Sequence, residues 1–351
     1  MELFSPMAEI VAAGNVFDIA AGETIIRGSH EIDEVRDFAL AAAAGLASHP
    51  RKLESRFLYD ARGSRLFDLI TQQPEYYLTR IETDLLATHA AKIRALTGPA
   101  TLVELGSGNS IKTEHLLKAW LAHESLVGYV AVDVSESALR EASRGISAAH
   151  PGVRVIGINS DYKSSFPLLS ALSPVLALFL GSSIGNFSPS ETTSFLQGVS
   201  TALTPGDFFL VGIDLVKEKS VIEAAYNDAA GVTQEFTRNL FVRMNRELGS
   251  GIDLSAVHHE AVYNPVKEQV EIQARFTRQQ TIRIEPLNER FTLSSGEAIQ
   301  TEISRKFNVD RFVSLAGRLD LAVEEVFTDQ QNWFALVLLR RREIKVSKGG
   351  N

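Results

Sequence analysis

The sequence predicts an α/β protein: a doubly wound sheet of mostly parallel strands, combined with a second, smaller α+β domain. Three observations predict this fold class. From residue 101 onward, short apolar runs bounded by Gly, Asp and Asn alternate with helical stretches, which is the pattern of a parallel sheet. Between residues 217 and 305 this alternation stops, and strand patterns follow one another. The chain then ends in one helix and two strands joined by a short turn, which indicates a closing antiparallel hairpin.

The N-terminal residues are expected to lie outside the sheet. Residues 1–30 have no strong periodicity and indicate an irregular N-terminal arm, whereas residues 31–80 indicate a helical segment. The expected helices run from Glu31 to Ala47, from Gly63-Ser64 to a stop at Pro74, and over Leu78–Leu96.

The main domain is expected to comprise residues 81–216 and 306–343, with 344–351 as a solvated basic tail. Its closing strands, DLAVEEVF and WFALVLLRRR, follow a helix at 308–317. A last strand that runs antiparallel is typical of class I methyltransferase sheets and much less typical of nicotinamide-binding sheets. Strands are expected at 101–105, 128–133, 153–158, 175–180 and 206–214, and helices near 110–122, 136–149 and 189–203.

Residues 217–305 are expected to form the second domain. A polar-rich helical stretch, Lys217–Leu248, precedes the strand patterns VHHEAVYNP, EQVEIQARF and QTIRIEPL. An irregular, Gly-marked stretch separates these from IQTEISRKF. The neighbours His258 and His259 would point to opposite faces of a strand, so they cannot chelate one metal together, and no metal is expected.

The composition fits an ordinary globular protein and argues against several classes of function. The 351 residues are 45% hydrophobic and 22% charged. A net charge of −8 and a pI of about 5.6 argue against nucleic acid as the main partner. The absence of cysteine excludes disulfides, thiolate zinc sites and cysteine nucleophiles. No signal-peptide pattern and no run of about 18 apolar residues occurs, so we expect a cytoplasmic protein without a membrane partner.

The stretch Thr101–Lys112, TLVELGSGNSIK, combines a strand, a glycine turn and the start of a helix. Backbone N–H groups at such a turn can face a polar ligand at the carboxyl edge of a parallel sheet. The turn lacks the third glycine of the GxGxxG fingerprint, which weakens a dinucleotide interpretation. Glu104, just before the turn, suits a cofactor that carries an ammonium group, which favours S-adenosylmethionine over NAD.

Polar residues further along the chain can complete a nucleoside site. Asp133 ends the next apolar run, and its two carboxylate oxygens can accept hydrogen bonds from both ribose hydroxyls. Asp161 can accept a hydrogen bond from an adenine amino group. Small residues at 176–187 allow close approach of a ligand, and Asn186 can bind a carboxylate or orient an amine. The alternatives are a capping role for Asp133 and a plain turn role for Asn186.

Three tyrosines lie in or beside loops of the helical segment: Tyr59, Tyr76 and Tyr77. Tyrosines in such places commonly serve as half-buried packing residues. The other interpretation is that their hydroxyl groups line a pocket. The sequence pattern alone leaves both interpretations open.

Several longer blocks are far more specific than the glycine turn. They are FLYDARGSRLFDLIT, PEYYLTRIE, VELGSGNSIKT, VDVS, GSSIGNF, GIDLVKEKSVIEAAYNDAAGVTQEFTRNL, IQTEISRKF and TDQQNWFALVLL. With these blocks in this order, the chain resembles the S-adenosylmethionine-dependent histidine Nα-methyltransferases of ergothioneine biosynthesis, from about Asp33 to Arg341. The resemblance implies a methyltransferase sheet plus a second domain that clasps the substrate.

The resemblance also implies residue roles. The implied cofactor contacts are Tyr59, Gly106, Lys112, Asp133 and Asp161, with Lys112 reaching the methionine carboxylate. The implied substrate contacts are Asn186 and Tyr226 on the α-carboxylate, Tyr76, Glu302 and Ser304 on the imidazole, and Phe236 and Gly181 around the amine. One position departs, because Ile272 stands where the family usually has methionine. A branched aliphatic side chain can still cover an imidazole face, but the change bears on ring selectivity.

The function that this resemblance implies is transfer of three methyl groups to the α-amine of L-histidine, which gives hercynine. Such a transfer is an in-line displacement, in which positioning supplies much of the acceleration. Tyr59 can guide the departing proton, although a phenol with a pKa near 10 is a poor proton acceptor. The alternatives are a related amino-acid or indole-amine N-methyltransferase, incomplete methylation, and a non-catalytic cofactor-binding module. No oligomer is required for any of these.

Overall fold

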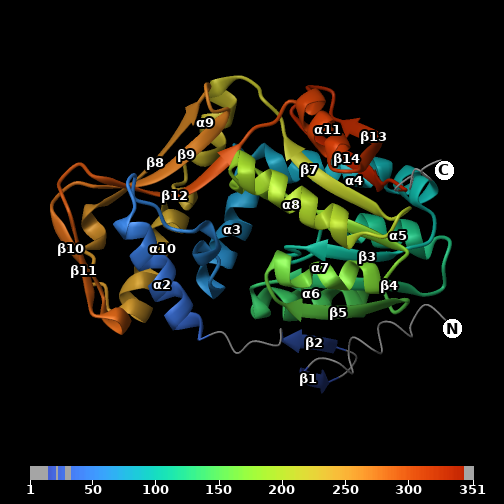
Figure 1. Ribbon diagram of the computed structural model, residues 1–351, viewed down its shortest axis with the longest axis horizontal. Coiled ribbons are helices and arrows are strands. Elements are labelled where there is room, and N and C mark those ends of the chain that lie inside the picture. Colours follow the sequence, from blue (N-terminus) through green and yellow to red (C-terminus); the bar gives the residue numbers. More distant parts are fainter. Residues whose placement is uncertain (1–14, 21–22, 28–32, 344–351) are drawn as a thin grey trace, which may run out of the picture.

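The computed structural model describes residues 15–20, 23–27 and 33–343 of the chain. Figure 1 shows a large sheet flanked by helices, beside a smaller group of strands and helices that includes β8, β9, β10 and α10. Within the described ranges, no helix is long and apolar enough to cross a membrane.

The large sheet has nine strands in the order β1-β2-β5-β4-β3-β6-β7-β14-β13. After the edge strands β1 and β2, the chain enters the middle of the sheet at β3, moves outward through β4 and β5, and then returns to the other side of β3 with β6 and β7. Strand β14 is antiparallel to both β7 and β13. The bounds are β1 Asn15–Ala20, β2 Glu23–Arg27, β3 Thr101–Leu105, β4 Val127–Asp133, β5 Val153–Asn159, β6 Val175–Phe179, β7 Phe208–Asp214, β13 Leu321–Thr328 and β14 Phe334–Arg341.

This topology confirms the predicted fold class, a doubly wound methyltransferase-type sheet with a closing antiparallel hairpin. The chain reverses its winding direction between β3 and β6, and ligands of open α/β sheets bind at the carboxyl ends of the strands beside such a reversal. The glycine turn that follows β3 lies at this point. The predicted central strands are also confirmed, to within two residues at each end.

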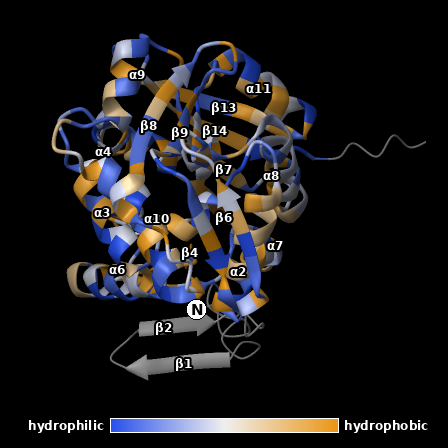
Figure 2. Cartoon of the chain, turned by 90° about the vertical axis from the view of Figure 1, so that its left-hand side faces the viewer, coloured by the Kyte–Doolittle hydropathy of each residue, from blue (hydrophilic) through white to orange (hydrophobic). Residues whose placement is uncertain are grey.

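Helices cover both faces of the sheet because its central strands are apolar on both faces. In β3 every residue is buried, and neighbours such as Leu102 and Val103 belong to two different hydrophobic clusters on opposite faces. Helices α4 (Tyr77–Thr97), α5 (Glu114–Leu121) and α6 (Glu136–Ala149) contribute to the first cluster. Helices α7 (Tyr162–Ala171), α8 (Pro189–Ala202) and α11 (Val309–Arg318) contribute to the second. In Figure 2 several of these helices carry hydrophilic and hydrophobic residues together, as expected for helices with one face on a core.

A second, three-stranded antiparallel sheet has the order β12-β9-β8. Burial alternates along β9, so this sheet has one buried and one more exposed face. We call these three strands, with α9 and α10, the small-sheet layer. Their bounds are β8 Val257–Asn264, β9 Gln269–Phe276, β12 Ala298–Arg305, α9 Lys219–Tyr226 and α10 Val232–Leu248.

The N-terminal helices pack against the small-sheet layer and so join it to the rest of the protein. These are α2 (Glu34–Ala47), the short 3₁₀ helix η2 (Ser55–Leu58) and α3 (Ala61–Thr71), which contact α10. The backbone N–H of Leu53 donates to the carbonyl of Gln300 at 2.8 Å, which attaches this segment to β12. The buried residues of the layer belong to the same hydrophobic cluster as those of α4 and α5. The two parts of the fold therefore share one core.

Three expectations about local structure were wrong. Within the expected irregular arm, β1 and β2 form a hairpin, and β2 extends the large sheet by pairing in parallel with β5. A helix, α7, follows β5 although none was expected there, and it begins at the cap formed by Asp161. The stretch expected to be irregular before β12 contains β11 (Glu289–Leu293), which pairs with β10 (Gln280–Ile284). Strand β11 is mostly exposed and so lacks the apolar run by which buried strands are detected, and α7 contains Pro167, a residue that argues against a helix.

Candidate functional site

The glycine turn after β3 is held in a left-handed backbone conformation by the end of the neighbouring strand. Gly106 and Gly108 have φ angles of 72° and 52°, which residues with a Cβ adopt at a cost. Asp133, at the end of β4, accepts hydrogen bonds from the backbone N–H groups of Gly108 at 2.9 Å and Ser135 at 2.8 Å. Burial raises the pKa of the Asp133 carboxyl, and these N–H donors oppose that rise. The carboxylate predicted to bind a ribose therefore also organises the turn.

Asp161 and Tyr162 lie on the other side of this turn. Asp161 caps α7 by accepting from the backbone N–H groups of Lys163 at 2.9 Å and Ser164 at 3.1 Å. Burial alone would raise its pKa, but these hydrogen bonds outweigh burial and lower it. A Cβ at Gly106 would lie 3.2 Å from the ring of Tyr162, so the turn and the tyrosine are in contact. Tyr162 directly follows Asp161 but was not among the site residues predicted from the sequence.

Lys112 is paired with the buried carboxylate of Glu82, a residue that was not predicted from the sequence. Its Nζ contacts Glu82, a fully buried residue of α4. Both carboxylate oxygens of Glu82 also accept from the backbone N–H of Gly181, at 2.8 and 2.9 Å. A Cβ at Gly212 would lie 2.2 Å from Glu82 Oε1, so a glycine in β7 makes room for this carboxylate. Glu82 thus connects Lys112 to the carboxyl end of β6.

Glu104 is buried beneath the turn. Its Oε2 accepts hydrogen bonds from Thr113 Oγ1 at 2.7 Å and from the hydroxyl of Tyr129 at 2.5 Å. Burial raises its pKa to about 7. Because one oxygen already serves these two hydroxyl groups, Glu104 helps to fix the segment that leads into α5.

A second set of predicted residues meets around β12. The short helix η3 (Ser183–Asn186) carries Asn186, whose Nδ2 donates to Glu302 Oε1 at 3.0 Å. The hydroxyl of Tyr226, at the end of α9, lies 2.7 Å from Ser304 Oγ. Burial raises the pKa of Glu302 to about 7, and the hydrogen bond from Asn186 opposes that rise.

The close approach of η3 to β12 depends on one glycine. A Cβ at Gly185 would lie 2.9 Å from the backbone oxygen of Arg305, closer than real Cβ contacts. Since a backbone atom cannot turn aside as a side-chain tip can, only glycine lets the two elements lie this close. This contact brings Asn186 to Glu302.

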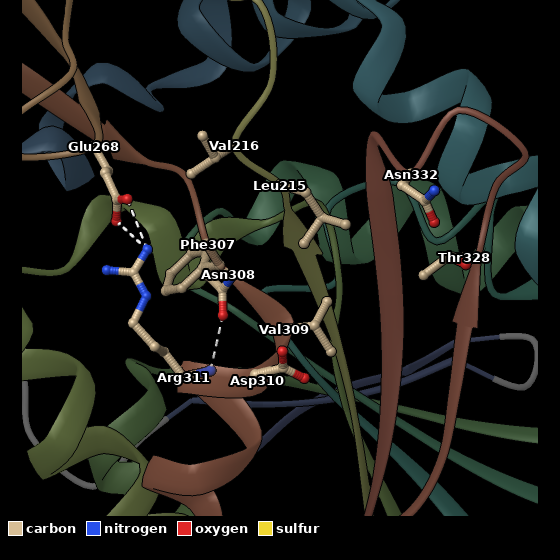
Figure 3. A pocket seen from close by; sticks show the side chains of 10 residues that line it. All are labelled: Leu215, Val216, Glu268, Phe307, Asn308, Val309, Asp310, Arg311, Thr328 and Asn332. Atoms are coloured by element: carbon tan, nitrogen blue, oxygen red, sulfur yellow. Dashed lines mark hydrogen bonds and ion pairs between the residues drawn. The ribbon is translucent and has the colours of Figure 1, made fainter.

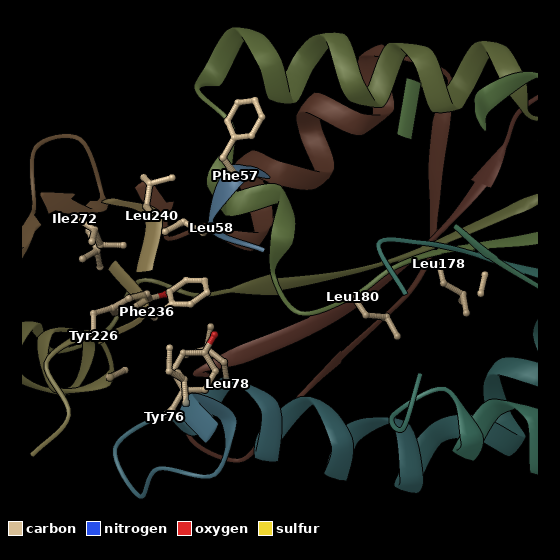
Figure 4. Packing of buried hydrophobic residues seen from close by; sticks show 14 of the residues in the cluster. Phe57, Leu58, Tyr76, Leu78, Leu178, Leu180, Tyr226, Phe236, Leu240 and Ile272 are labelled. Carbon is tan, nitrogen blue, oxygen red and sulfur yellow. The ribbon is translucent and has the colours of Figure 1, made fainter. Parts of the chain in front are cut away.

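Aromatic rings from helices α3, α9 and α10 and from two loops form a wall beside these polar pairs. Tyr59 packs edge-on against Phe236 with ring centroids 5.3 Å apart, and Tyr76 packs against Tyr226 at 6.3 Å. Phe67 lies between the two pairs, 5.6 Å from Tyr59 and 6.2 Å from Tyr76. Figure 4 shows Tyr76, Tyr226 and Phe236 in this cluster, with Ile272 beside them. In the β9–β12 pairing, Ile272 stands opposite Glu302.

The loop tyrosines divide between the two interpretations that the sequence left open. Their rings pack, yet among the described residues the hydroxyl groups of Tyr59 and Tyr76 have no hydrogen-bond partner. Burial raises the pKa of both phenols, and the nearby Glu302 adds to the rise, so both are neutral donors at ordinary pH. Tyr77 instead turns away and donates to Asp214, with distances of 3.1 and 2.9 Å to its two oxygens.

Of the two adjacent histidines, the half-buried His259 has a structural role. His259 makes hydrogen bonds to Thr237 Oγ1 at 2.9 Å and to the carbonyl of Tyr226 at 2.8 Å, whereas His258 is exposed. Through these bonds His259 joins β8 to α10 and to the end of α9. The residues that the structure describes include no group of three or more His, Asp or Glu side chains placed to hold a metal.

A separate pocket of about 390 Å³ lies between the ends of β7 and β12 and the start of α11, and it contains none of the predicted site residues. Figure 3 shows that its rim is crossed by the ion pair of Arg311 with Glu268. The carboxylates, amides and hydroxyls described above lie elsewhere, at the carboxyl edge of the large sheet and on β12. We therefore place the candidate site there.

Known proteins of similar sequence bear on the family of this chain. The model of the family described as "Histidine-specific methyltransferase, SAM-dependent" matches residues 38–341. A histidine N-alpha-methyltransferase of Mycolicibacterium smegmatis is 39% identical over 85% of this chain and 93% of its own length. Its counterpart in Mycobacterium tuberculosis is 35% identical over 84% and 92%. An N-methyltransferase of Aspergillus flavus is 30% identical over 82% and 80%. These matches confirm the resemblance inferred from the sequence blocks.

Gly185→Ala is expected to destabilise the protein, because its Cβ would press on the backbone of β12. We expect the free energy of unfolding to fall by about 1–3 kcal/mol, as for other overpacked sites. Gly145→Ala is the matched control, since it lies exposed in α6 with no atom near its Cβ, and alanine should stabilise that helix slightly. Urea unfolding of the two variants gives the comparison, and equal effects from both would refute the close-approach argument.

Glu302→Gln is expected to stabilise the protein at high pH only. Because the folded pKa of about 7 exceeds the ordinary 4.5, the folded state holds the proton more tightly than the unfolded chain, and stability is lost as pH rises from 4.5 to 7. Glutamine cannot ionise but can still accept from Asn186. The gain over wild type should be near zero at pH 4.5 and on the order of 1–3 kcal/mol at pH 8. Urea unfolding across this range measures it, and a pH-independent difference would contradict the assignment.

Proposed function

We propose that this chain, which belongs to the family of histidine-specific, S-adenosylmethionine-dependent methyltransferases, methylates the α-amine of L-histidine three times and releases hercynine. Membership makes the protein an S-adenosylmethionine-dependent methyltransferase, as its sequence predicts. The number of transfers is proposed from the resemblance to the histidine Nα-methyltransferases, whereas the choice of substrate rests on one observation. Two polar pairs, Asn186 with Glu302 and Tyr226 with Ser304, meet beside the aromatic wall.

On the cofactor side, we assign the groups around the glycine turn. The oxygens of Asp133 keep acceptor capacity beyond their backbone partners, so they can also accept from the two ribose hydroxyls. Gly106 and Tyr162 would flank the cofactor, and Asp161 would accept from its adenine amino group. Lys112 would bind the methionine carboxylate, while Glu82 holds the Lys112 ammonium group in place. The residues present thus fit S-adenosylmethionine, which supplies the methyl group.

On the substrate side, the small-sheet layer and η3 supply the contacts. Asn186 and Tyr226 would donate to the α-carboxylate, and Glu302 and Ser304 would bind the two imidazole nitrogens. A ring without those nitrogens would leave the remaining hydrogen-bonding capacity of Glu302 and Ser304 unsatisfied in a buried place, which is costly. Tyr76 would add its unpartnered hydroxyl to the ring. Phe236, Gly181 and Ile272 would shape the pocket around the amine and the imidazole face.

The transfer itself needs position more than it needs a strong base. The neutral amine attacks the methyl carbon in line with the C–S bond, which breaks and leaves its electrons on sulfur. The first and second products form as ammonium ions, so each must lose a proton before its nitrogen can accept another methyl group. The trimethylated product has no N–H proton to lose. Tyr59 has a raised pKa and therefore stays neutral. We assign it to guiding that proton toward solvent as a hydrogen-bonding hydroxyl, and not to holding it.

The central prediction is that purified protein, incubated with L-histidine and excess S-adenosylmethionine, forms trimethylhistidine. Mass spectrometry over time should show the mono- and dimethylated forms appear first and then decline. A reaction without histidine, and one with S-adenosylhomocysteine added as inhibitor, are the controls. If no methylated histidine forms under any condition, the proposal is wrong; if the reaction stops after one or two transfers, only trimethylation is wrong.

Ile272 gives a second, distinct prediction about selectivity. We expect histidine to exceed tryptophan and phenylalanine in kcat/KM by at least about 100-fold, because those rings leave buried polar groups unpaired. Since Ile272 covers a ring face without polar contact, Ile272→Met should keep the same ranking. Steady-state kinetics on a panel of amino acids tests both statements. A different amino acid at the top of the wild-type ranking would favour a related amino-acid N-methyltransferase.

A further inference from the structure

Lys306 is a fully buried lysine immediately after β12, and it lies directly behind the substrate-facing hydroxyls. Its side chain is 0% exposed. Its ammonium contacts three oxygens: Asp214 Oδ2 at 2.7 Å, the hydroxyl of Tyr226 at 2.8 Å and Ser304 Oγ at 2.9 Å. An ammonium has three hydrogens to donate, so each of them has one acceptor. The three contacts thus satisfy Lys306 completely.

Asp214, the last residue of β7, is likewise fully buried and balances more than one cation. Lys217 also donates to it, at 2.5 Å, as does the hydroxyl of Tyr77. The cluster therefore has two lysines for one carboxylate. Lys217 differs from Lys306 in one respect that matters below: it contacts Tyr77 and the carbonyl of Leu215 but neither Tyr226 nor Ser304.

The contacts of Lys306 fix the direction of the hydroxyl hydrogens on Tyr226 and Ser304. Both oxygens accept from the ammonium, so neither hydroxyl can point its hydrogen toward Lys306. The two oxygens are 2.7 Å apart, so one hydroxyl donates to the other and uses one of the two hydrogens. Among the described residues the pair makes no other hydrogen bond. One hydroxyl hydrogen is therefore left to donate to a ligand.

We propose that Lys306, held by Asp214, is a positioning residue that turns the Tyr226–Ser304 pair into a hydrogen-bond donor for the substrate. The inference rests on the proposed function, in which these hydroxyls bind the amino-acid substrate. Lys306 makes no contact with the reacting atoms in this scheme. It acts by occupying the inward-facing lone pairs and by polarising both hydroxyls, since hydrogen bonds from a charged donor strengthen the next donor in the chain.

Stability alone does not account for this arrangement. Burying an ammonium and a carboxylate costs desolvation energy, and an apolar replacement of similar volume is often as stable or more stable. Sequence position supports a site role: Glu302, Ser304 and Lys306 alternate along one strand and its continuation, so their side chains share a face. The positively charged Lys306 also lies close enough to Glu302 to lower its pKa against the effect of burial.

The test compares Lys306→Met with Lys217→Met. Each variant removes one buried ammonium from Asp214, but only the first removes a donor to Tyr226 and Ser304. We expect Lys306→Met to raise the KM for histidine by about 10–100-fold, the effect of losing charge-assisted hydrogen bonds, with a smaller change in kcat. Calorimetric binding of S-adenosylhomocysteine should stay unchanged. Lys217→Met should leave the KM for histidine within about threefold of wild type.

A triple variant separates positioning from folding. If Lys306→Met is too unstable to assay because it leaves Asp214 short of a partner, then Asp214→Asn with both Lys306→Met and Lys217→Met removes the carboxylate and both ammonium groups, and should recover the melting temperature. Its KM for histidine should stay raised, because the donor to Tyr226 is still missing. Recovery of KM together with melting temperature would overturn the proposal, as would equal KM effects from Lys306→Met and Lys217→Met.

Failure of the proposed function is distinguishable from failure of this inference. The wild-type enzyme is assayed first, and absence of methylated histidine would refute the function by itself. The same set of variants is then compared on whichever amino acid the wild type methylates or binds. A selective rise in KM or Kd for that amino acid in Lys306→Met supports the positioning role, and an unchanged value overturns it.

Discussion

The site depends on one strand, β12, which belongs to the small sheet but leads straight back into the large one. Its residues Glu302 and Ser304 face the aromatic wall, and the chain then reaches Lys306 beside Asp214 at the end of β7. The backbone N–H of Phe307 donates to the carbonyl of Asp214, which ties the end of β12 to the end of β7. The groups that we assign to the substrate are thereby fixed relative to the sheet that carries the glycine turn.

This coupling is strengthened because the two parts of the fold share a hydrophobic core. The cluster that covers one face of the large sheet continues through Tyr76 and Tyr226 to Phe236 and Ile272. The aromatic wall is therefore part of the core and not a loop at its edge. Packed cores deform little, so such a wall can hold reacting groups in a narrow range of positions. That rigidity suits a displacement reaction in which alignment of the reacting groups supplies much of the rate acceleration.

Buried charge is concentrated in the same region. Glu82 holds Lys112, Asp214 holds two lysines, and Glu302 and Glu104 have carboxyl pKa values raised to about 7. Each of these groups costs free energy to bury, so their number between the glycine turn and β12 is informative. Functional sites commonly accept such costs because fixed dipoles and charges bind polar substrates strongly once water is excluded.

The sequence by itself determined the sheet class, the glycine turn, the closing hairpin and the family, because local periodicity and contiguous blocks of residues indicate these features directly. It also singled out Asp133, Asn186 and Glu302, whose places at strand ends or within a family block can be read directly. Only the tertiary structure revealed Glu82, Lys306 and Asp214, each of which is defined by a partner far away along the chain. It alone showed that a short N-terminal hairpin extends the sheet, because β2 pairs with β5, a strand that lies far along the chain. The reason is physical: local patterns report what a segment can bury, whereas a charge pair exists only once the fold has brought its two members together.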